Sequence, residues 1–394
     1  MRGTGVLAAC STIAVLAGLA IAHPAGAAVA GPAAAHPAQS WAGRVQAAAT
    51  TGSFLEGVAC QPTTSACTAV GFRISSTGTP STLAERWNGT AWVSQPTPTP
   101  ERHGRQGGEL DGVACTSRTA CQAVGSSFGT GGHRLLGVGW NGTRWSSQAY
   151  ATPAPVADPS GVACAWRKDC VAVGGRTNLG TLAEHWNGTR WSARPTPRRG
   201  TLVSVSCPAS HNCTAVGFSA SQNHLAEHWN GTKWSAQVSP SIPEDTSLDG
   251  VSCVSTSNCM AVGWQGSEDV TGPLVEHWTG GRWTVPNVPD PDPGGAAELN
   301  SVSCTSASSC MAVGDDQAGP GGSDVTLAAQ WNGTAWALLP TPNPDTYSAL
   351  YSVSCTGPAA CVAVGAGSAA PGGTVTPVTE FWDGTAWTVQ PAAG

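Results

Sequence analysis

The sequence predicts an all-β protein, a seven-bladed β-propeller of four-stranded antiparallel blades with one disulfide in each blade. Three observations lead to this fold class. Fourteen of the 15 cysteines form close pairs, 14 of the 17 tryptophans form pairs five residues apart, and the two kinds of pair alternate seven times. Successive first cysteines lie 43 to 55 residues apart, which is a period typical of propellers and solenoids. Each period also holds four short strand-like runs.

The repeats, numbered 1 to 7, begin near residues 54, 109, 159, 201, 247, 298 and 349. In repeat 4 the strand-like runs are 202–207, 213–218, 224–229 and 232–238. Asn230-Gly231 separates the last two runs and is typical of a two-residue hairpin turn. Four antiparallel strands in each repeat are typical of a propeller blade. A helical repeat would instead require a 3.6-residue period.

The tryptophan pairs belong to the predicted third and fourth strands. With Asn88-Gly89 as a two-residue turn, we expect Trp87 to lie opposite Thr90 and Glu85 opposite Trp92. Side chains alternate along a strand, so both tryptophans share one face of the blade. We expect this face to pack against the neighbouring blade. The alternative is that the indole rings are platforms for a ligand.

We expect one local disulfide in each repeat. In a hairpin that pairs Val302 with Ala312, Cys304 and Cys310 face each other, and facing residues lie ~4.5–5.5 Å apart, within disulfide range. Zinc is the alternative, but a zinc site needs four ligands in one place, whereas the repeats spread the pairs around a ring. The pairs are Cys60–Cys67, Cys115–Cys121, Cys164–Cys170, Cys207–Cys213, Cys253–Cys259, Cys304–Cys310 and Cys355–Cys361.

Three short motifs recur in the chain: Ser-Val-Ser-Cys, Cys-x-Ala-Val-Gly and Trp-Asn-Gly-Thr-x-Trp. With these motifs, residues 54–391 resemble secreted actinobacterial β-propeller repeat proteins, most of which are uncharacterised. The Asn-Gly-Thr-x-Trp turn is also distantly similar to the Asp-box of sialidase-type propellers. It lacks the leading Ser, and its Asn directly precedes Gly. The resemblance implies a propeller fold and an exported protein, and it implies no particular activity.

The first 53 residues differ from the repeats. Residues 1–30 hold one charge, an apolar run and small-residue cleavage sites, which together predict a signal peptide. A lipoprotein cleavage box ending at Cys10 is the alternative, although only six residues precede it. Residues 31–53 form an N-terminal segment in which 40–47 could supply a closing strand, and residues 54–394 form the propeller. We expect a secreted, extracellular protein in an oxidising compartment, without a membrane span.

One rim of the predicted ring is variable in sequence. The Cys loops and Asn-Gly turns form a constant rim, whereas the second loop of each repeat and the connections between repeats form a variable rim. Binding residues concentrate on loops held by a rigid scaffold, so we expect the functional surface on the variable rim and the central mouth beside it. The candidate binding residues are Arg102, His103, Arg105, Arg134, Arg198 and Arg199.

Charge is divided unevenly along the chain. Residues 1–200 have a balance of +8 and residues 201–394 a balance of −14, for a net charge of −6. A closed ring would therefore have a basic side and an acidic side. We expect the basic side to attract an anionic partner, although solvated loops are the alternative. The acidic side would hold Glu244, Asp245, Asp249, Asp290, Asp292, Asp315, Asp316 and Asp324.

The sequence gives little support for catalysis. The recurring carboxylates Glu85, Glu184, Glu227, Glu276 and Glu380, and the recurring imidazoles His185, His228 and His277, occupy equivalent places in different repeats and so diverge. We expect the glutamates to satisfy hydrogen bonds beside the tryptophans. We expect no catalytic residues, no cofactor and no metal, although the loop from Asp315 to Asp324 offers carboxylates for Ca²⁺, with a spacing that fits no EF-hand.

The predicted function is therefore binding without catalysis. We expect a monomer that binds a polysaccharide, an anionic cell-wall polymer or an extracellular protein through its variable rim, and that does not bind nucleic acid. The alternative is a propeller-type glycoside hydrolase or polysaccharide lyase with acidic residues near the central mouth, because glycosidase chemistry uses two carboxylates on either side of a bound sugar.

Overall fold

The computed structural model divides the chain into two compact units, Met1–Gly31 and Pro32–Gly394. It describes residues 51–61, 66–98, 105–129, 133–150, 157–176, 180–221, 223–267, 270–317 and 322–393, all in the second unit. These residues form thirty β-strands and no helix, so the predicted all-β class is confirmed. The expected signal peptide and the segment 40–47 lie outside the described residues.

The same strand order recurs along the chain. The first strands of the repeats are β1 (Gly52–Cys60), β5 (Arg105–Gly108) continued by β6 (Gly112–Ser117), β11 (Ala157–Trp166), β15 (Gly200–Ala209), β19 (Asp245–Ser255), β23 (Ala296–Ser306) and β27 (Tyr347–Gly357). The second strands are β2 (Cys67–Ile74), β7 (Ala120–Gly129), β12 (Asp169–Arg176), β16 (Asn212–Ser219), β20 (Asn258–Ser267), β24 (Ser309–Gln317) and β28 (Ala360–Ser368).

The third and fourth strands carry the tryptophan pairs. The third strands are β3 (Pro80–Trp87), β8 (Arg134–Trp140), β13 (Gly180–Trp186), β17 (His224–Trp229), β21 (Val270–Trp278), β25 (Asp324–Trp331) and β29 (Thr376–Trp382). The fourth strands are β4 (Trp92–Gln95), β9 (Trp145–Ser147), β14 (Arg190–Ala193), β18 (Trp234–Gln237), β22 (Trp283–Thr284), β26 (Trp336–Leu339) and β30 (Trp387–Val389). A short additional strand, β10 (Ala149–Tyr150), pairs with β14 in parallel.

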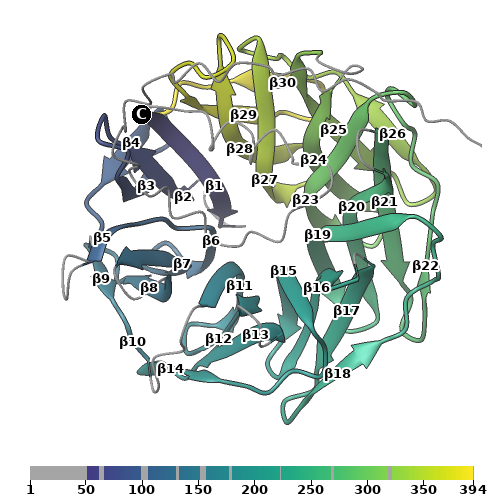
Figure 1. The fold of residues 1–394 in the computed structure, drawn as a ribbon, viewed down its shortest axis with the longest axis horizontal. Helices are drawn as coiled ribbons and strands as arrows, with labels where there is room; N and C mark the ends of the chain where they lie inside the picture. The colour runs from purple at the N-terminus through teal and green to yellow at the C-terminus, as the bar shows by residue number, and fades with distance from the viewer. Residues whose placement is uncertain are drawn as a thin grey trace, which may run out of the picture. The chain divides into compact units, whose positions relative to one another are not determined.

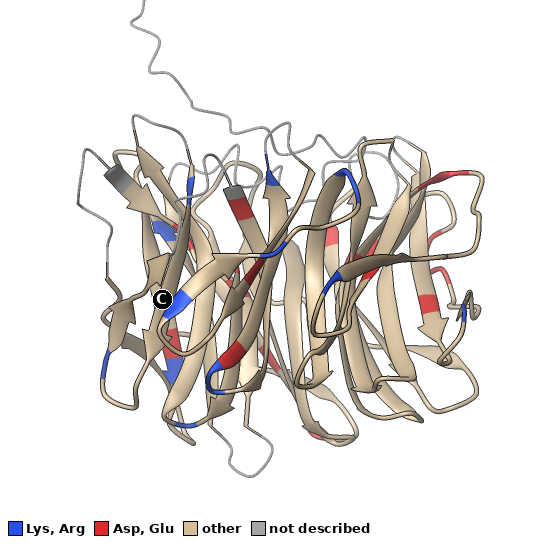
Figure 2. Ribbon diagram, turned by 90° about the horizontal axis from the view of Figure 1, so that it is seen from below, with Lys and Arg blue, Asp and Glu red and all other residues tan. Residues whose placement is uncertain are grey.

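Within the second unit, the strands lie around a ring (Figure 1), with β1, β6, β11, β15, β19, β23 and β27 nearest the centre and the fourth strands at the outside. The short β5 lies farther out than β6. Seen from the side, the strands run between the two rims (Figure 2). They form sheets of four, five, nine, eight and four strands. The larger sheets arise because single bridges, Gly175 to Thr201 and Thr271 to Ala296, join neighbouring repeats.

The predicted disulfides are confirmed in all seven repeats, with Cα–Cα distances of 3.9 to 4.1 Å. Cys304 pairs with Cys310 and Val302 with Ala312, which is the register expected from the hairpin. Each bridge therefore fastens the end of a first strand to the start of its second strand.

The predicted register of the tryptophan hairpin is wrong by two residues. Trp87 lies directly opposite Trp92, and Glu85 lies opposite Ser94. The turn contains four residues because the Asn88 side-chain oxygen accepts hydrogen bonds from the amides of Thr90 and Ala91, each at 2.9 Å. Gly89 has a φ of +105° while Asn88 does not have a positive φ, so the type I′ turn, which needs positive φ at both central residues, does not form.

The tryptophans pack between neighbouring repeats, as predicted. Trp140 and Trp145 of repeat 2 are buried against Val70 and Ala84 of repeat 1. Equivalent clusters join the other repeats in order. A cluster containing Trp92 and residues of repeat 7 joins the last repeat to the first. The hydrophobic core is thus a set of layers between sheets.

The ring closes by direct contact between its first and last repeats. The Val58 and Cys60 amides of β1 donate hydrogen bonds to the hydroxyls of Ser352 and Ser354 on β27, at 3.1 and 3.0 Å. Gly52 also forms a bridge with Val375. Repeat 7 has its own fourth strand, β30. Whether residues 40–47 add a further strand concerns residues outside those described.

Candidate functional site

A β-bulge interrupts the first strand at the same place in the repeats. In β15 the pairing shifts between Leu202 and Ser204, so that Val203 is the extra residue. The same shift occurs in repeats 1, 3, 5, 6 and 7. In repeat 2, where the strand is divided, the Asp111 amide donates to the Val124 carbonyl at 2.8 Å. A bulge redirects the side chain of its extra residue.

The glycine of each Cys-x-Ala-Val-Gly motif permits the bulge. Gly217 lies opposite Leu202, and a Cβ on Gly217 would overlap the carbonyl oxygen of Thr201. The equivalent glycine of every other repeat meets a first-strand carbonyl in the same way. Glycine is therefore required at the last position of this motif, because the first strand approaches the second too closely there for any side chain.

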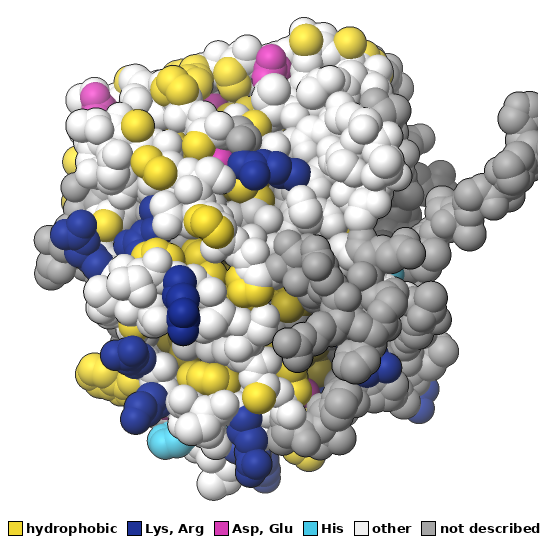
Figure 3. All heavy atoms as spheres, turned by 90° about the vertical axis from the view of Figure 1, so that its left-hand side faces the viewer, with side chains coloured by type: hydrophobic (Ala, Val, Ile, Leu, Met, Phe, Trp, Pro, Cys, Tyr) yellow, Lys and Arg dark blue, Asp and Glu magenta, His cyan; other side chains and the backbone are white. Residues whose placement is uncertain are grey.

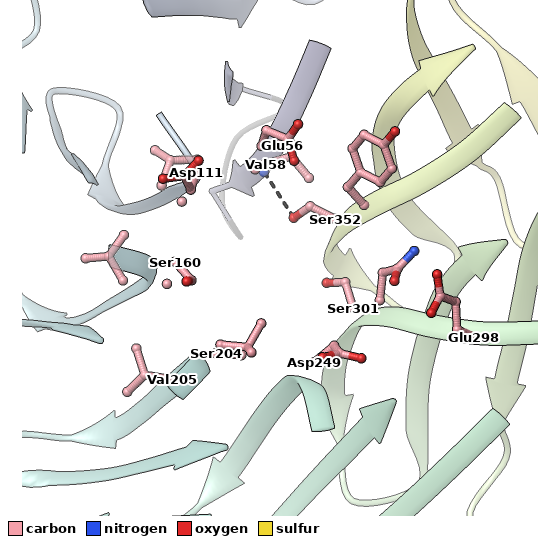
Figure 4. A pocket seen from close by; sticks show the side chains of 18 of the residues that line it. Glu56, Val58, Asp111, Ser160, Ser204, Val205, Asp249, Glu298, Ser301 and Ser352 are labelled. Carbon is pink, nitrogen blue, oxygen red and sulfur yellow. Dashed lines mark hydrogen bonds between the residues drawn. The ribbon is translucent and has the colours of Figure 1, made fainter. Parts of the chain in front are cut away.

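The bulge residues of all seven repeats line one cavity of about 410 Å³. Figure 4 shows four of them, Glu56, Asp111, Ser160 and Asp249, each from a different repeat, around a common space. These residues are of six types, with Asp in both repeats 2 and 5, although the scaffold around them repeats. They are Glu56, Asp111, Ser160, Val203, Asp249, Asn300 and Tyr351.

Small residues bring the first strands close together around this axial cavity. The residue after each bulge is Gly or Ser. Where it is Ser, its hydroxyl accepts a hydrogen bond from the next repeat: Ser204 from the Val251 amide at 3.2 Å and Ser301 from the Val353 amide at 3.2 Å. These bonds join the strands that carry the bulges, so the cavity wall is part of the rigid scaffold.

Acidic side chains are crowded together beside the axial cavity on the side of repeats 1 to 3. Burial, followed by the nearby charges of Glu56 and Asp158, raises the pKa of Glu109 to about 8. Burial and the same neighbours, with Glu109, hold the pKa of Asp111 well above its ordinary value. Each of these groups disfavours ionisation of the others. An anionic ligand would add to this repulsion, whereas a neutral or cationic ligand would not.

The opposite side of the axial cavity is also acidic. Glu298 lines it together with Asn300, whose amide donates to Asp315 at 2.9 Å. Burial and neighbouring carboxylates, first that of Glu56, raise the pKa of Tyr351 well above its ordinary value. Within the described residues, the buried Tyr351 hydroxyl has no hydrogen-bond partner. Its oxygen is buried beside the cavity, so a ligand would bond to it after the side chain turns toward the cavity.

Of the arginines predicted as binding residues, Arg134, Arg198 and Arg199 have described side chains, and none of the three lines this cavity. Arg134 is exposed at the start of β8, and Arg198 and Arg199 are exposed in the connection to β15. The Arg198 carbonyl accepts a hydrogen bond from the Thr181 amide of β13 at 3.4 Å, so this connection runs over a third strand, away from the axis. Arg105 begins β5. Arg102 and His103 lie outside the described residues.

Several residues of the expected acidic side are buried or line the axial cavity instead of lying on the outer surface. Asp249 lines the axial cavity and accepts a hydrogen bond from the Ser247 hydroxyl at 2.7 Å. Asp315, Asp316 and Asp324 are buried, and burial with nearby carboxylates raises the pKa of Asp316 to about 6. Glu244 is exposed. In the described part of the chain, no cluster of three or more Asp, Glu, His or Cys side chains could hold a metal ion.

The recurring glutamates do not meet at one site. They are buried between neighbouring repeats: Glu227 accepts a hydrogen bond from the Thr181 hydroxyl at 3.4 Å, and Glu380 from the Thr326 hydroxyl at 3.4 Å. Glu276 lies 3.0 Å from Nε2 of His224. Their partners belong to the preceding repeat, so these carboxylates connect sheets rather than line the axis.

Sequence reasoning did not identify the bulge residues as a set, and it assigned Asp249 to the acidic side of the ring, although a signal was present. Each stands four positions before the first cysteine of its repeat, where the neighbouring Gly/Ser and Val recur and this one position varies. Trp264 gives a second signal, because it belongs to no tryptophan pair and lines the axial cavity. Recognising either signal requires knowing that the first strands surround one axis.

Comparison with known proteins identifies the fold and no family. No protein-family model matches the chain, and no curated protein matches it. Among solved structures it is similar to the GH74 xyloglucanase from Xanthomonas campestris, with a TM-score of 0.52 and 13% identity. That match covers 86% of this chain and only 55% of the xyloglucanase. At this identity the similarity shows a common propeller-like fold alone.

Two further similar structures have TM-scores of 0.49. SapL1 lectin in complex with α-methyl fucoside is 15% identical, and the match covers 76% of this chain and 99% of the lectin. YCF48 from Cyanidioschyzon merolae is 14% identical, and the match covers 80% of this chain and 93% of YCF48.

Proposed function

We propose that this protein binds a neutral or amine-bearing carbohydrate, without chemical turnover, in the axial cavity and over the variable rim beside it. One observation carries the proposal: a repeated bulge places one residue from each repeat, of six types in all, around a single cavity. A repeated scaffold whose cavity-facing position varies is suited to recognising an asymmetric ligand. The cavity volume also falls within the ~300–1,000 Å³ typical of small-molecule sites.

The chemistry of the cavity favours hydroxyl groups. Carboxylates accept hydrogen bonds, whereas Ser160, Asn300 and Tyr351 can both donate and accept. Sugar hydroxyls can supply both functions. Burial, followed by the charges of neighbouring carboxylates, raises the pKa of Glu109 and Asp111. The same surroundings disfavour an anion and favour a neutral sugar or an amino sugar.

Tyr351→Phe tests the proposal because it removes only the hydroxyl that has no partner among the described residues. If a ligand hydrogen bond is lost, affinity should fall by about five- to tenfold, equivalent to ~1 kcal/mol. Calorimetry against the neutral and amino sugars retained from a glycan panel would measure it. Tyr347→Phe, on the same strand but away from the cavity lining, is the matched control and should bind within about twofold of the unaltered protein. Equal affinity of all three proteins, or no retained sugar, would contradict the proposal.

The second candidate function is glycoside hydrolysis or polysaccharide lysis. It is favoured by Glu109 and Asp111, whose raised pKa values would keep a proton available near neutral pH, beside other carboxylates. A screen for reducing ends or unsaturated products on mixed polysaccharides separates the two functions. Turnover that Asp111→Asn, a change in the cavity lining, abolishes would establish an enzyme, and binding without turnover supports the first proposal.

We also infer that each repeat forms one four-stranded blade, which gives seven blades. The recurrence of the strand pairings and of the layers between repeats supports this assignment. An experimental structure with another number of sheets around the axis would contradict it.

We propose secretion as the route by which the protein reaches its ligand. Seven disulfides indicate an oxidising environment, and the expected signal peptide and the resemblance to actinobacterial repeat proteins agree with export. Searching the described residues for a helix long and apolar enough to cross a membrane found none. Finding the chain uncleaved and inside the producing cell would contradict this proposal.

A further inference from the structure

The constant rim carries an arc of cations over repeats 2 to 5. In each of these repeats the residue before the second tryptophan is basic, whereas the other three repeats have alanine there. The Cys loops of repeats 2 and 3 add further basic residues. All seven side chains are exposed: Arg118, Arg144, Arg167, Lys168, Arg190, Lys233 and Arg282.

These cations belong to one continuous edge. A Cβ on Gly188 would meet the Lys168 side chain, so the Cys loop of repeat 3 covers the turn that precedes Arg190. Contacts also cross between repeats, since Arg86 of repeat 1 donates to the Arg118 carbonyl at 3.0 Å and Ser210 of repeat 4 donates to Asp169 of repeat 3 at 2.7 Å. Figure 3 faces the side of the ring that carries β5 and β9, and Lys and Arg side chains exceed Asp and Glu there.

Few carboxylates oppose these charges. In the described part of the constant rim the carboxylates are Asp169 and Asp383. Asp169 is engaged by His185 at 2.8 Å and by Ser210. Asp383 lies in repeat 7, outside the arc, and its side chain accepts hydrogen bonds from the Thr385 and Ala386 amides. A chain with a net charge of −6 therefore keeps a basic arc on this rim.

An exposed tryptophan stands within the same arc. Trp166 is 68% exposed and is, among the described residues, the one exposed aromatic side chain. It precedes Arg167 and Lys168 in a loop closed by the Cys164–Cys170 disulfide. An exposed indole ring lacks the stabilisation that the paired tryptophans gain from burial of their apolar surface. A flat ring beside guanidinium and ammonium groups can stack on a sugar ring whose substituents are anionic.

We propose that the arc on the constant rim is a second binding site, which takes an acidic polysaccharide. Its cations contact the carboxylates of successive uronic acid units, and Trp166 packs against the face of one sugar ring. The site lies on the rim opposite the variable loops, so one protein could hold a neutral sugar at the axis and an acidic chain at the other face. A polymer suits an arc better than a single small anion does, because the charges extend over four repeats.

The test compares two triple variants that remove equal charge. Arg144→Gln, Arg190→Gln and Lys233→Gln neutralise the arc, whereas Arg134→Gln, Arg198→Gln and Arg199→Gln neutralise the variable rim. All six positions are exposed, and thermal melting verifies the fold of each variant. Binding to polygalacturonate is measured at low and physiological salt. The arc variant should lose at least about tenfold in affinity and much of its salt dependence, and the rim variant should lose less than about twofold.

Trp166→Ala separates stacking from charge. It should weaken binding to polygalacturonate while leaving the salt dependence unchanged, because no charge is removed. Fully methyl-esterified polygalacturonate, which has the same sugar rings without charge, should bind weakly to every variant. Equal losses in the two triple variants, a loss confined to the rim variant, or tighter binding to single-stranded DNA than to polygalacturonate would overturn the proposal.

Discussion

At the scale of single residues, the site depends on a glycine that never touches the ligand space. Gly217 and its equivalents leave room for the carbonyl of the first strand, and that close approach accommodates the bulge that turns Val203 or its counterpart inward. The glycine of the repeated motif and the variable side chain of the bulge therefore depend on each other structurally. The glycine is constant because its role is steric, and the bulge residue varies because its role is chemical.

Gly217→Ala should destabilise the protein by about 3 kcal/mol, because the new Cβ overlaps the Thr201 carbonyl oxygen and backbone, not a flexible side chain, must move. Urea denaturation measures the change. Gly357→Ala is the control, since a Cβ there meets no atom within 4 Å, and it should remain within about 0.5 kcal/mol of the unaltered protein. If the two variants were equally stable, the first and second strands of repeat 4 could move apart to admit the new Cβ without a cost in free energy of unfolding.

At the same scale, sequence could predict the disulfides but not the cavity residues. Cysteine pairing is local: a separation of six or seven residues within a hairpin places Cys304 opposite Cys310. The convergence of Glu56 with Tyr351 is not local, because almost the whole ring separates them in sequence. Only the closed arrangement of first strands brings the two side chains to one cavity.

At the scale of elements, a single side-chain acceptor decides the hairpin register. Alternating apolar residues around Asn-Gly predict a two-residue turn, but the carboxamide oxygen of Asn230 accepts hydrogen bonds from the Thr232 and Lys233 amides, each at 3.0 Å. These bonds stabilise a four-residue turn and shift the pairing by two residues, which preserves the face of every side chain. Sequence therefore predicted the shared face of the tryptophans but not their direct opposition.

Asn230→Ala should weaken the hairpin by about 1–2 kcal/mol, because two backbone amides and the Thr232 hydroxyl lose their acceptor. The loss appears as a lower melting temperature. Asn230→Asp should retain most of the stability, since repeat 7 uses Asp383 in the equivalent turn. If Asp and Ala lower the melting temperature equally, the acceptor does not hold the turn.

At the scale of the whole molecule, buried acids couple neighbouring repeats. Burial raises the pKa of Glu184, Glu227 and Glu380 to about 7 in each case. An acid whose pKa is higher in the folded protein than in the unfolded chain binds more protons when folded. Its contribution to stability is complete below the unfolded value of about 4.5 and is lost as pH rises through about 7.

The repeats in the sequence are enough to predict a closed ring, but they do not predict where its charged side chains lie. Seven similar units that each expose a tryptophan face must stack on one another, and the last must meet the first, as Val58 and Ser352 do. The position of charged residues along the chain predicts a basic side and an acidic side of the ring. The structure shows two further differences in where charged side chains lie. Acidic side chains such as Asp249 lie near the axis of the ring, and exposed basic side chains such as Arg144 lie at the constant rim.

The melting temperature should fall as pH rises from 6.5 to 8.5, because the buried glutamates must ionise in the folded protein. This window avoids most of the opposing effect of His228 and His277, whose pKa values are lowered by burial and which destabilise the fold at lower pH. Glu227→Gln keeps an acceptor for the Thr181 hydroxyl and removes the titrating group. Between pH 6.5 and 8.5 the free energy of unfolding of this variant should therefore fall by about 1 kcal/mol less than that of the unaltered protein. Glu244→Gln, at an exposed position, should leave the slope unchanged. A flat profile for the unaltered protein, or the same slope after Glu227→Gln, would mean that this carboxylate is solvated and does not couple repeats 3 and 4.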